Sequence, residues 1–219
     1  MSPAAAAQRV EVERGVHRVI VEEVGGRRLR RFVVDCPRGR SMDLSDCGRC
    51  ADCRGYTLRS LEASTIVCSL PAGVVPTGAA AGTVGAAMQR DVVCVAAELP
   101  LGGALDLLAD HRQRGVPVID QADRPIGVLQ ASAVIALLRA RGVAVPNAAD
   151  SGATPRPLDP ALVPAVVRTI PVGEIMTRTV HTARETDPLD GARARMAAER
   201  LPRLMVVDGE GRTIGALHP

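Results

Sequence analysis

Apolar and polar positions alternate along the first part of the chain. The stretch VHRVIVEEVGGRRLRRFVVDC, residues 16–36, alternates on both sides of the pair Gly25-Gly26. Alternation with a period of two is typical of half-buried strands, and a Gly-Gly pair between two strands is typical of a tight turn. A further strand-like run, STIVCSL, follows at residues 64–70. The pattern therefore predicts a β-hairpin and another strand before residue 80.

The rest of the chain contains an internal repeat. Residues 84–129 align without a gap with residues 172–217 at a constant offset of 88, and 17 of the 46 aligned positions are identical. The run RPIGVL at the end of the first segment matches RTIGAL at the end of the second. A gapless register that keeps proline, aspartate and glycine in place indicates two copies of one structural unit.

Each copy has the pattern of a β-α-β-β unit. A short helix ends at AAM or EIM, and a β segment follows, DVVCVA or TVHTA. Pro100 and Pro188 then open helical patterns, and proline is tolerated in the first turn of a helix. An apolar strand, VPVID or LMVVD, and a last strand, IGVL or IGAL, complete the unit. We therefore expect an α/β (α+β) fold with small sheets that helices cover on one face.

The segment between the repeats differs in composition from both of them. It contains PNAADSGATPRPLDP, which predicts a flexible loop, and then ALVPAVV, which predicts a short helix that covers the second unit. The residues before the repeats are expected to form a separate small β domain. The expected boundaries are 1–80 for the cysteine-rich β domain and 81–219 for the pair, with unit one at 81–141, the loop at 142–170 and unit two at 171–219.

The repeats resemble a known module. The motifs VGAAMQRDVVCV, GVPVID and RPIGVL in the first copy, and VGEIMTRTVHT, LPRLMVVD and RTIGAL in the second, are similar to the CBS domain, the cystathionine-β-synthase-type module that usually occurs in tandem. The resemblance implies that the two units pack about a pseudo-twofold axis. It also implies clefts between them that hold adenosine-type ligands, such as an adenine nucleotide, and assembly into a homodimer.

The resemblance assigns two groups of residues in each unit to these clefts. The first group lies in the first strand, and the second lies where the next strand begins. The alternative is that each of them is a core residue, since apolar strand positions usually serve packing. The positions are Val92, Val93, Val116, Pro117 and Val118 in unit one, and Val180, His181, Pro202, Leu204 and Val206 in unit two.

The ligand signature that ends each unit departs from the family pattern. A hydroxyl residue and, three residues later, an aspartate typically hold phosphate and ribose. In unit one, Gln130 stands where the hydroxyl belongs and Ala133 where the carboxylate belongs, whereas in unit two His218 stands at the hydroxyl position. Gln130 can still donate and accept hydrogen bonds, but Ala133 cannot bind a ribose diol.

Five cysteines precede the repeats: Cys36, Cys47, Cys50, Cys53 and Cys68. Four thiolates can bind one zinc ion tetrahedrally, and the binding energy then helps a small domain to fold. Both Cys47/Cys50 and Cys50/Cys53 have the Cys-x-x-Cys spacing of a zinc knuckle. Two foursomes therefore remain open, namely Cys36, Cys50, Cys53 and Cys68, or Cys36, Cys47, Cys50 and Cys53.

An iron–sulfur cluster is the second reading of these cysteines, because Cys-x-x-Cys-x-x-Cys opens a ferredoxin-type run, although the closing Cys-Pro is missing. Free reduced thiols are the third reading, and clustered exposed thiols are open to oxidation. Cys94 lies in a predicted core strand and is expected to serve packing only.

Composition narrows the classes of function. Aromatic residues make up 1% of the chain, which argues against a base-stacking reader of single strands, and a net charge of +3 is too small to indicate nucleic acid. No apolar run has the length of a membrane span, and the start lacks the pattern of a signal peptide. We expect a cytoplasmic protein, where clustered cysteines bind metal or perform redox chemistry more often than they form structural disulfides.

The sequence favours a non-enzymatic regulatory or interaction module. No Ser/His/Asp set, phosphate loop or carboxylate pair stands out, and the four histidines are scattered. A metal-binding domain joined to a ligand-sensing or dimerising pair, acting on an unknown protein partner, is the first hypothesis. A redox or metal sensor that uses the cysteine cluster is the alternative. The basic run Arg27–Arg31 is expected to be a solvated hairpin face, with contact to phosphate or to an acidic partner as the other reading.

Overall fold

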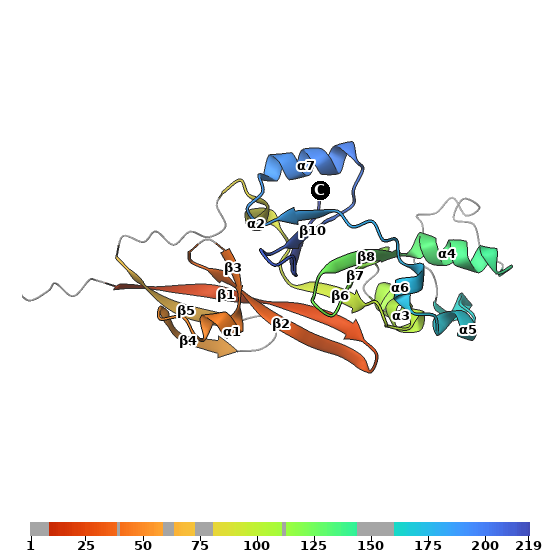
Figure 1. Ribbon diagram of the computed structural model, residues 1–219, viewed down its shortest axis with the longest axis horizontal. Coiled ribbons are helices and arrows are strands. Elements are labelled where there is room, and N and C mark those ends of the chain that lie inside the picture. The colour runs from red at the N-terminus through yellow and green to blue at the C-terminus, as the bar shows by residue number, and fades with distance from the viewer. Residues whose placement is uncertain (1–8, 39, 59–63, 73–80, 111–112, 144–159) are drawn as a thin grey trace, which may run out of the picture.

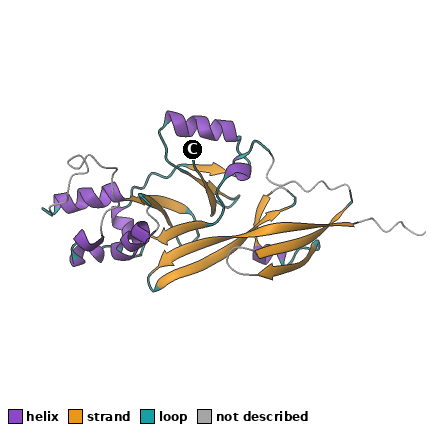
Figure 2. Ribbon diagram, turned by 180° about the vertical axis from the view of Figure 1, so that it is seen from behind, coloured by secondary structure: helices purple, strands orange, loops and turns teal. Residues whose placement is uncertain are grey.

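A computed structural model describes residues 9–38, 40–58, 64–72, 81–110, 113–143 and 160–219 (Figure 1). Most of the segment predicted as a flexible loop, 144–159, lies outside the described residues. In the described part, strands run through the whole molecule, whereas helices gather around the repeats (Figure 2).

The predicted hairpin is present as the two longest strands. Strand β1 spans Arg9–Glu23 and strand β2 spans Gly26–Cys36, and they pair antiparallel. Gly25 and Gly26 take φ angles of 98° and 108°, a left-handed conformation that glycine adopts without steric cost. The alternation of the sequence therefore predicted both the strands and the turn correctly.

The first half of β1 pairs with strands other than β2. Residues Arg9–Gly15 pair with β5, Ser64–Pro71, which also pairs with β4, Cys53–Leu58. Strand β3, Arg40–Asp43, pairs with β2 and leads into the one-turn helix α1, Leu44–Cys47. The cysteines thus lie on or between strands that β1 and β2 hold together.

The repeats form the expected β-α-β-β units. Unit one consists of α2 (Val84–Ala87), β6 (Val92–Ala96), α3 (Leu101–Asp110), β7 (Gly115–Ile119), β8 (Pro125–Gln130) and α4 (Ala131–Ala140). Unit two consists of α6 (Val172–Ile175), β9 (Thr182–Arg184), α7 (Leu189–Ala198), β10 (Leu204–Val207) and β11 (Thr213–Leu217). Between them lie the short helices η2 (Pro160–Leu162) and α5 (Ala165–Arg168).

The first helix of each unit packs against the other unit. The Val84 amide donates to the Asp187 carbonyl at 2.9 Å, and the Val172 amide donates to the Leu99 carbonyl at 2.9 Å. Each of these contacts maps onto the other when 88 is added to or subtracted from the residue numbers. Accordingly, α2 packs in the hydrophobic core of unit two, and α6 packs in that of unit one. The sequence repeat is therefore a pseudo-twofold repeat in space.

The glycines of the repeated IG motif are required where the units meet. A Cβ on Gly127 would lie 2.4 Å from the Met176 sulfur, and a Cβ on Gly215 would lie 2.8 Å from both the Gln89 carbonyl oxygen and the Met88 sulfur. Both distances are too short for any side chain. Glycine is required at both positions because two segments of the chain approach each other closely there.

Two expectations from the sequence need correction or extension. Helix η2 and helix α5 pack against α3 of unit one, and Arg168 pairs with Asp106 at 2.9 Å, so the prediction that this segment covers unit two is wrong. The N-terminal strands also continue the sheet of unit one, because β1 pairs parallel with β6. The strand order β3-β2-β1-β6-β7-β8 therefore crosses residue 80, the expected domain boundary.

Candidate functional site

All five N-terminal cysteines line one pocket. Cys36 ends β2, Cys47 ends α1, Cys50 lies in the following turn, and Cys53 and Cys68 lie on β4 and β5. The cavity has a volume of about 20 Å³, which is room for one water molecule or one ion. The chain therefore brings together every cysteine predicted from the sequence as a metal ligand, while Cys94 is fully buried in β6, away from them.

The turn between Cys47 and Cys53 is held by the main chain. The Cys50 amide donates to the Cys47 carbonyl at 3.0 Å, and the Cys53 amide donates to the Cys50 carbonyl at 3.1 Å. The helix α1 that precedes this turn is capped by Asp43, which accepts from the Ser45 amide. These bonds direct three cysteines at a spacing of three toward one hollow.

Burial and mutual proximity disfavour thiolates in the pocket. Burial and, after it, the neighbouring cysteines, Cys36 foremost, together raise the pKa of Cys47 to about 12. Burial, followed by Cys36 and Cys53, also raises the pKa of Cys68. Both groups are therefore neutral thiols at pH 7 unless a cation compensates the charge, which is the electrostatic situation of a metal–thiolate site.

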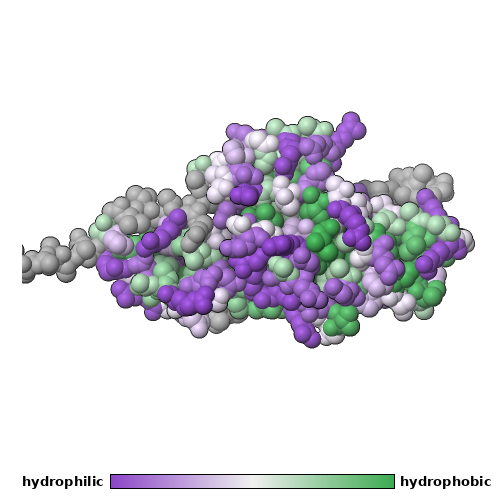
Figure 3. Space-filling model, viewed as in Figure 1, coloured by the Kyte–Doolittle hydropathy of each residue, from purple (hydrophilic) through white to green (hydrophobic). Residues whose placement is uncertain are grey.

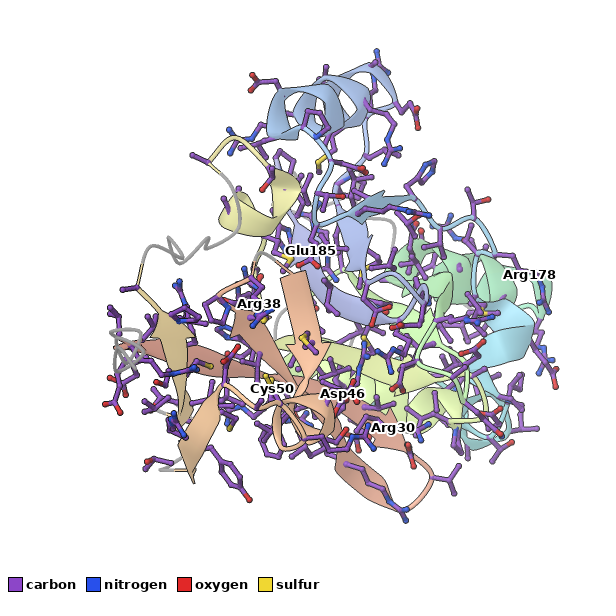
Figure 4. The ribbon with its side chains drawn as sticks, turned by 60° about the vertical axis from the view of Figure 1, so that its left-hand side comes forward. Arg30, Arg38, Asp46, Cys50, Arg178 and Glu185 are labelled. Atoms are coloured by element: carbon purple, nitrogen blue, oxygen red, sulfur yellow. The ribbon has the colours of Figure 1, made fainter. Side chains whose placement is uncertain are left out.

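Arg38 and Asp52, which the sequence did not single out, line the pocket, and Arg9 contacts Asp52. Arg9 and Arg38 both pair with the buried carboxylate of Asp52, which lies between Cys50 and Cys53. Hydrogen bonds from Arg38 and Arg9 hold the pKa of Asp52 below its usual value. Figure 4 shows Arg38 and Cys50 on the same N-terminal part of the molecule. The Arg38 guanidinium, which lines the pocket beside the thiols, would offset part of the negative charge of a thiolate cluster.

The chemistry of the donor set fits zinc, although its arrangement is not that of a closed site. Within the described residues, no three His, Cys, Asp or Glu side chains are grouped so that they hold an ion as they stand. The sulfurs would have to move inward to coordinate a metal together.

A buried arginine connects the N-terminal strands to both units. Arg31 of β2 has a side chain only 6% exposed, and its Nη1 lies 3.3 Å from Oδ2 of Asp208 in unit two. Its Nε lies 3.6 Å from Oδ2 of Asp123 in unit one, and its Nη2 donates to the Thr213 carbonyl. The expectation that Arg27–Arg31 forms a solvated face is therefore wrong at Arg31.

Electrostatics support this junction. Burial raises the pKa of Asp208, but hydrogen bonds from Arg212 and the charges of Arg212 and Arg31 outweigh it and lower the pKa below its usual value. Asp123 has a positive φ of 61°, and the matching position in unit two is Gly211, with a φ of 80°. An aspartate in this conformation costs about 1 kcal/mol or more. The ion pair between the Asp123 carboxylate and Arg31 offsets this cost.

Two more polar links join the cysteine region to the units. Arg90, at the entry of β6, pairs with Asp35, the residue before Cys36. The Ser41 hydroxyl donates to the Glu185 carboxylate of unit two at 2.6 Å, and Figure 4 shows Glu185 at this boundary. The pocket is therefore tied to unit one through β2 and to unit two through β3.

The cleft positions assigned to unit one are mostly part of a closed sheet. Val92, Val116, Pro117 and Val118 are buried and Val93 is half-buried. The outer edge of β6 is covered by β1, which places Val19 opposite Val92 and Ile20 opposite Val93. Gln130 is exposed at the start of α4 and accepts from the Ser132 hydroxyl at 3.3 Å.

The corresponding positions of unit two are more open. Val180 and His181 are half-buried and precede β9, which begins only at Thr182, and Pro202 is exposed. His181 lies 3.3 Å from the Glu199 carboxylate. In the described part of the chain, β9 pairs on one side only, with β10, while Leu204 and Val206 are buried in that strand.

The comparison with protein families agrees with this architecture. The family model of the CBS domain matches residues 84–140 and 172–219, which are the two units. The chain carries a tandem pair of CBS domains. The mixed α/β fold of the pair and the resemblance read from the repeated motifs are thereby confirmed, whereas the N-terminal cysteine-rich region lies outside the matched residues.

Relatives of the CBS pair are distant. The uncharacterised protein MJ1404 of Methanocaldococcus jannaschii is 28% identical over 122 residues, which are 56% of this chain, and this chain spans only 24% of that protein's length. A structure of CBSX2 in complex with AMP is 25% identical, with a TM-score of 0.45, and covers 62% of this chain and 89% of its own. The CBS domain pair of protein MJ0100, in complex with 5′-methylthioadenosine and S-adenosyl-L-methionine, is 20% identical, with a TM-score of 0.43, and covers 62% and 92%.

Regarding the membrane, none of the helices in the described ranges has the length and apolar character needed to cross one.

Proposed function

We propose that this chain is a regulatory module in which a zinc-stabilised N-terminal domain is joined to a CBS pair that senses a small ligand. The observation that carries the proposal is the position of the five-cysteine pocket on strands that continue the sheet of unit one. In this proposal the protein acts in the cytoplasm as a homodimer, without catalysis, and passes its state to a protein partner.

The pocket residues would hold the metal through their sulfurs. Bound zinc would keep four thiolates deprotonated and cross-link β2, α1, β4 and β5, which adds folding free energy to a small layer of strands. Arg38 would then face a negatively charged cluster. The face over β1 and β2 is largely polar (Figure 3). The buried cluster of the cysteine region is small, and it consists of Val16, Val34, Cys47, Ile66 and Cys68.

Elemental analysis with an absorption spectrum, on protein purified without oxygen, tests the metal. We expect one zinc per chain, no visible absorbance, and a melting temperature that falls when a chelator removes the zinc. The variant Cys36→Ser should lose zinc, because Cys36 belongs to both possible foursomes, while Cys94→Ser should keep it. Iron with sulfide and a brown chromophore, or no metal at all, would contradict the zinc proposal.

An adenine nucleotide is the proposed ligand of the CBS pair, as the family resemblance implies. The openness of Val180, His181 and Pro202 favours the cleft of unit two over that of unit one, where β1 covers β6. Calorimetric titration with AMP, ATP and S-adenosylmethionine tests this. His181→Trp should abolish binding and the equivalent Val93→Trp in unit one should not. Absence of heat with all three would refute nucleotide sensing.

The second candidate is a redox or metal sensor. Cys50 is the exposed member of the five cysteines, and the links Arg90–Asp35 and Ser41–Glu185 connect the pocket to both units. A change in the pocket can therefore reach the CBS pair. Hydrogen exchange in β6 that rises when the pocket is oxidised would support this function, and exchange confined to β4 would argue against it.

A further inference from the structure

Cys53 and Cys68 differ from the other cysteines because they face each other across a strand pair. They are directly opposite in the antiparallel ladder of β4 and β5. Opposite residues of such a ladder have Cα atoms about 4.5–5.5 Å apart, within the range of about 4.4–6.8 Å that disulfides span. The ladder shifts register between Cys53 and Gly55, so this pair lies at its end. A disulfide there would join two side chains that the register already places opposite each other.

Further contacts hold β4 and β5 in place next to Cys53 and Cys68. Cys68 lies on β5 between β1 and β4, opposite Val12 on one side and Cys53 on the other. The Ser69 amide donates to the Asp52 carbonyl at 2.7 Å, which adds a bond next to the cysteine pair. Cys36 lies opposite Arg40 in the β2–β3 ladder, and Cys47 and Cys50 come from α1 and from a turn, so none of these three has another cysteine opposite it in a ladder.

We propose that Cys53 and Cys68 form a disulfide when the cysteine pocket is oxidised, and that this bond dismantles the metal site. The second clause rests on the proposed function, because it takes the pocket as the zinc site. Joining two of the five sulfurs leaves three, Cys36, Cys47 and Cys50, which is fewer than the four that a structural zinc site uses. Oxidation would therefore release zinc and leave a cross-linked β4–β5 pair.

Hydrogen peroxide is a sufficient oxidant. Cys53 is half-buried and Cys68 is buried, so within this pair Cys53 is the sulfur that peroxide reaches first. Its sulfur takes one oxygen atom, the O–O bond breaks, and one water leaves. The Cys68 sulfur then attacks the Cys53 sulfur, the S–S bond forms, and the S–O bond breaks as a second water leaves with the Cys68 proton. Two thiols lose two electrons and two protons, and the peroxide gains both.

The test uses the full chain, stripped of metal with a chelator and then treated with one equivalent of hydrogen peroxide. After alkylation of the remaining thiols, trypsin should give residues 50–54 linked to residues 60–90, as the arginines of the sequence dictate. Because residues 50–54 contain both Cys50 and Cys53, the assignment needs variants. The linked peptide should persist in Cys50→Ser and be lost in Cys53→Ser and in Cys68→Ser.

A link between residues 41–49 and residues 50–54, a loop within residues 50–54, or no disulfide at all would overturn the proposal. Mass spectrometry of the digest reads the disulfide without any metal, so its outcome is separate from that of the zinc measurement. If the purified chain holds no zinc but the Cys53–Cys68 link forms, only the metal part of the proposed function fails. In zinc-loaded protein, release of one zinc per link formed is the expected result.

Discussion

Arg31→Ala tests whether the N-terminal strands and the CBS pair form one cooperative unit. The substitution removes the cation between Asp123 and Asp208 and the donor to the Thr213 carbonyl. The Asp208 side chain is only 7% exposed, so its charge cannot be solvated after the change. Breaking a buried pair by removing one partner costs about 3–5 kcal/mol.

The structure places the expected cost at the lower end of that range. Asp208 keeps the Arg212 guanidinium, whose Nε lies 2.9 Å from its Oδ2, and Asp123 keeps Arg30 at 3.8 Å. We therefore expect a loss of about 3 kcal/mol in the free energy of unfolding, or a melting temperature lower by about 6–12 °C for a chain of this size.

Arg28→Ala is the matched control on the same strand. The Arg28 side chain is 66% exposed and lies 3.8 Å from the Glu23 carboxylate, so its loss should cost less than about 1 kcal/mol. Urea unfolding, followed by circular dichroism and by hydrogen exchange in β10 and β11, measures both variants. If Arg31→Ala is no more destabilising than Arg28→Ala, the junction does not hold the two parts together and the reasoning is refuted.

Two further predictions concern the CBS pair. Gly215→Ala should lower the free energy of unfolding by about 1–3 kcal/mol, because its Cβ would lie 2.8 Å from the Gln89 carbonyl oxygen, whereas Gly209→Ala, with open space around it, should change it little; equal urea midpoints would contradict this. Because the folded pKa of Asp208 is lowered, its contribution to stability should be complete above the unfolded pKa of about 3.9 and lost as pH falls through the folded pKa. Asp208→Asn should flatten this loss in an acid titration of the urea midpoint, and an unchanged slope would argue against the pairing of Asp208 with Arg212 and Arg31.

The hydrophobic pattern predicted the elements well because local periodicity decides them. The Gly25-Gly26 turn, the strands on either side of it and the repeated β-α-β-β units all follow from residues that are close in sequence. The gapless offset of 88 predicted two copies of one unit, and the resemblance to the CBS domain implied their pseudo-twofold packing; equivalent residues do make equivalent contacts in both units.

Contacts between residues far apart in the chain could not be predicted from the sequence. Nothing in the run Arg27–Arg31 distinguishes Arg31, because its burial depends on where unit two places Asp208. The pairing of β1 with β6 is a choice among strand edges that one sequence does not reveal. A signal for Asp123 did exist, since the aligned position in the other unit is Gly211, and an aspartate in place of a left-handed glycine suggests a second role for its carboxylate.

The cysteine pocket was predictable in part. The spacing of Cys47, Cys50 and Cys53 indicated that their sulfurs share a site, and the structure places all five sulfurs around one cavity. The contacts of Asp52 could not be predicted, because Arg38 and Asp52 are separated by the cysteine turn and Arg9 reaches Asp52 only when β1 pairs with β5. The choice of four ligands among five cysteines stays a prediction.

X-ray absorption at the zinc edge of protein purified without oxygen decides whether the cysteine pocket binds zinc. We expect one zinc per chain with four sulfur neighbours at about 2.3 Å, lost when Cys47 and Cys68 are both replaced by serine. Zinc surrounded by nitrogen and oxygen, or protein without zinc and with five freely titratable N-terminal thiols, would contradict it.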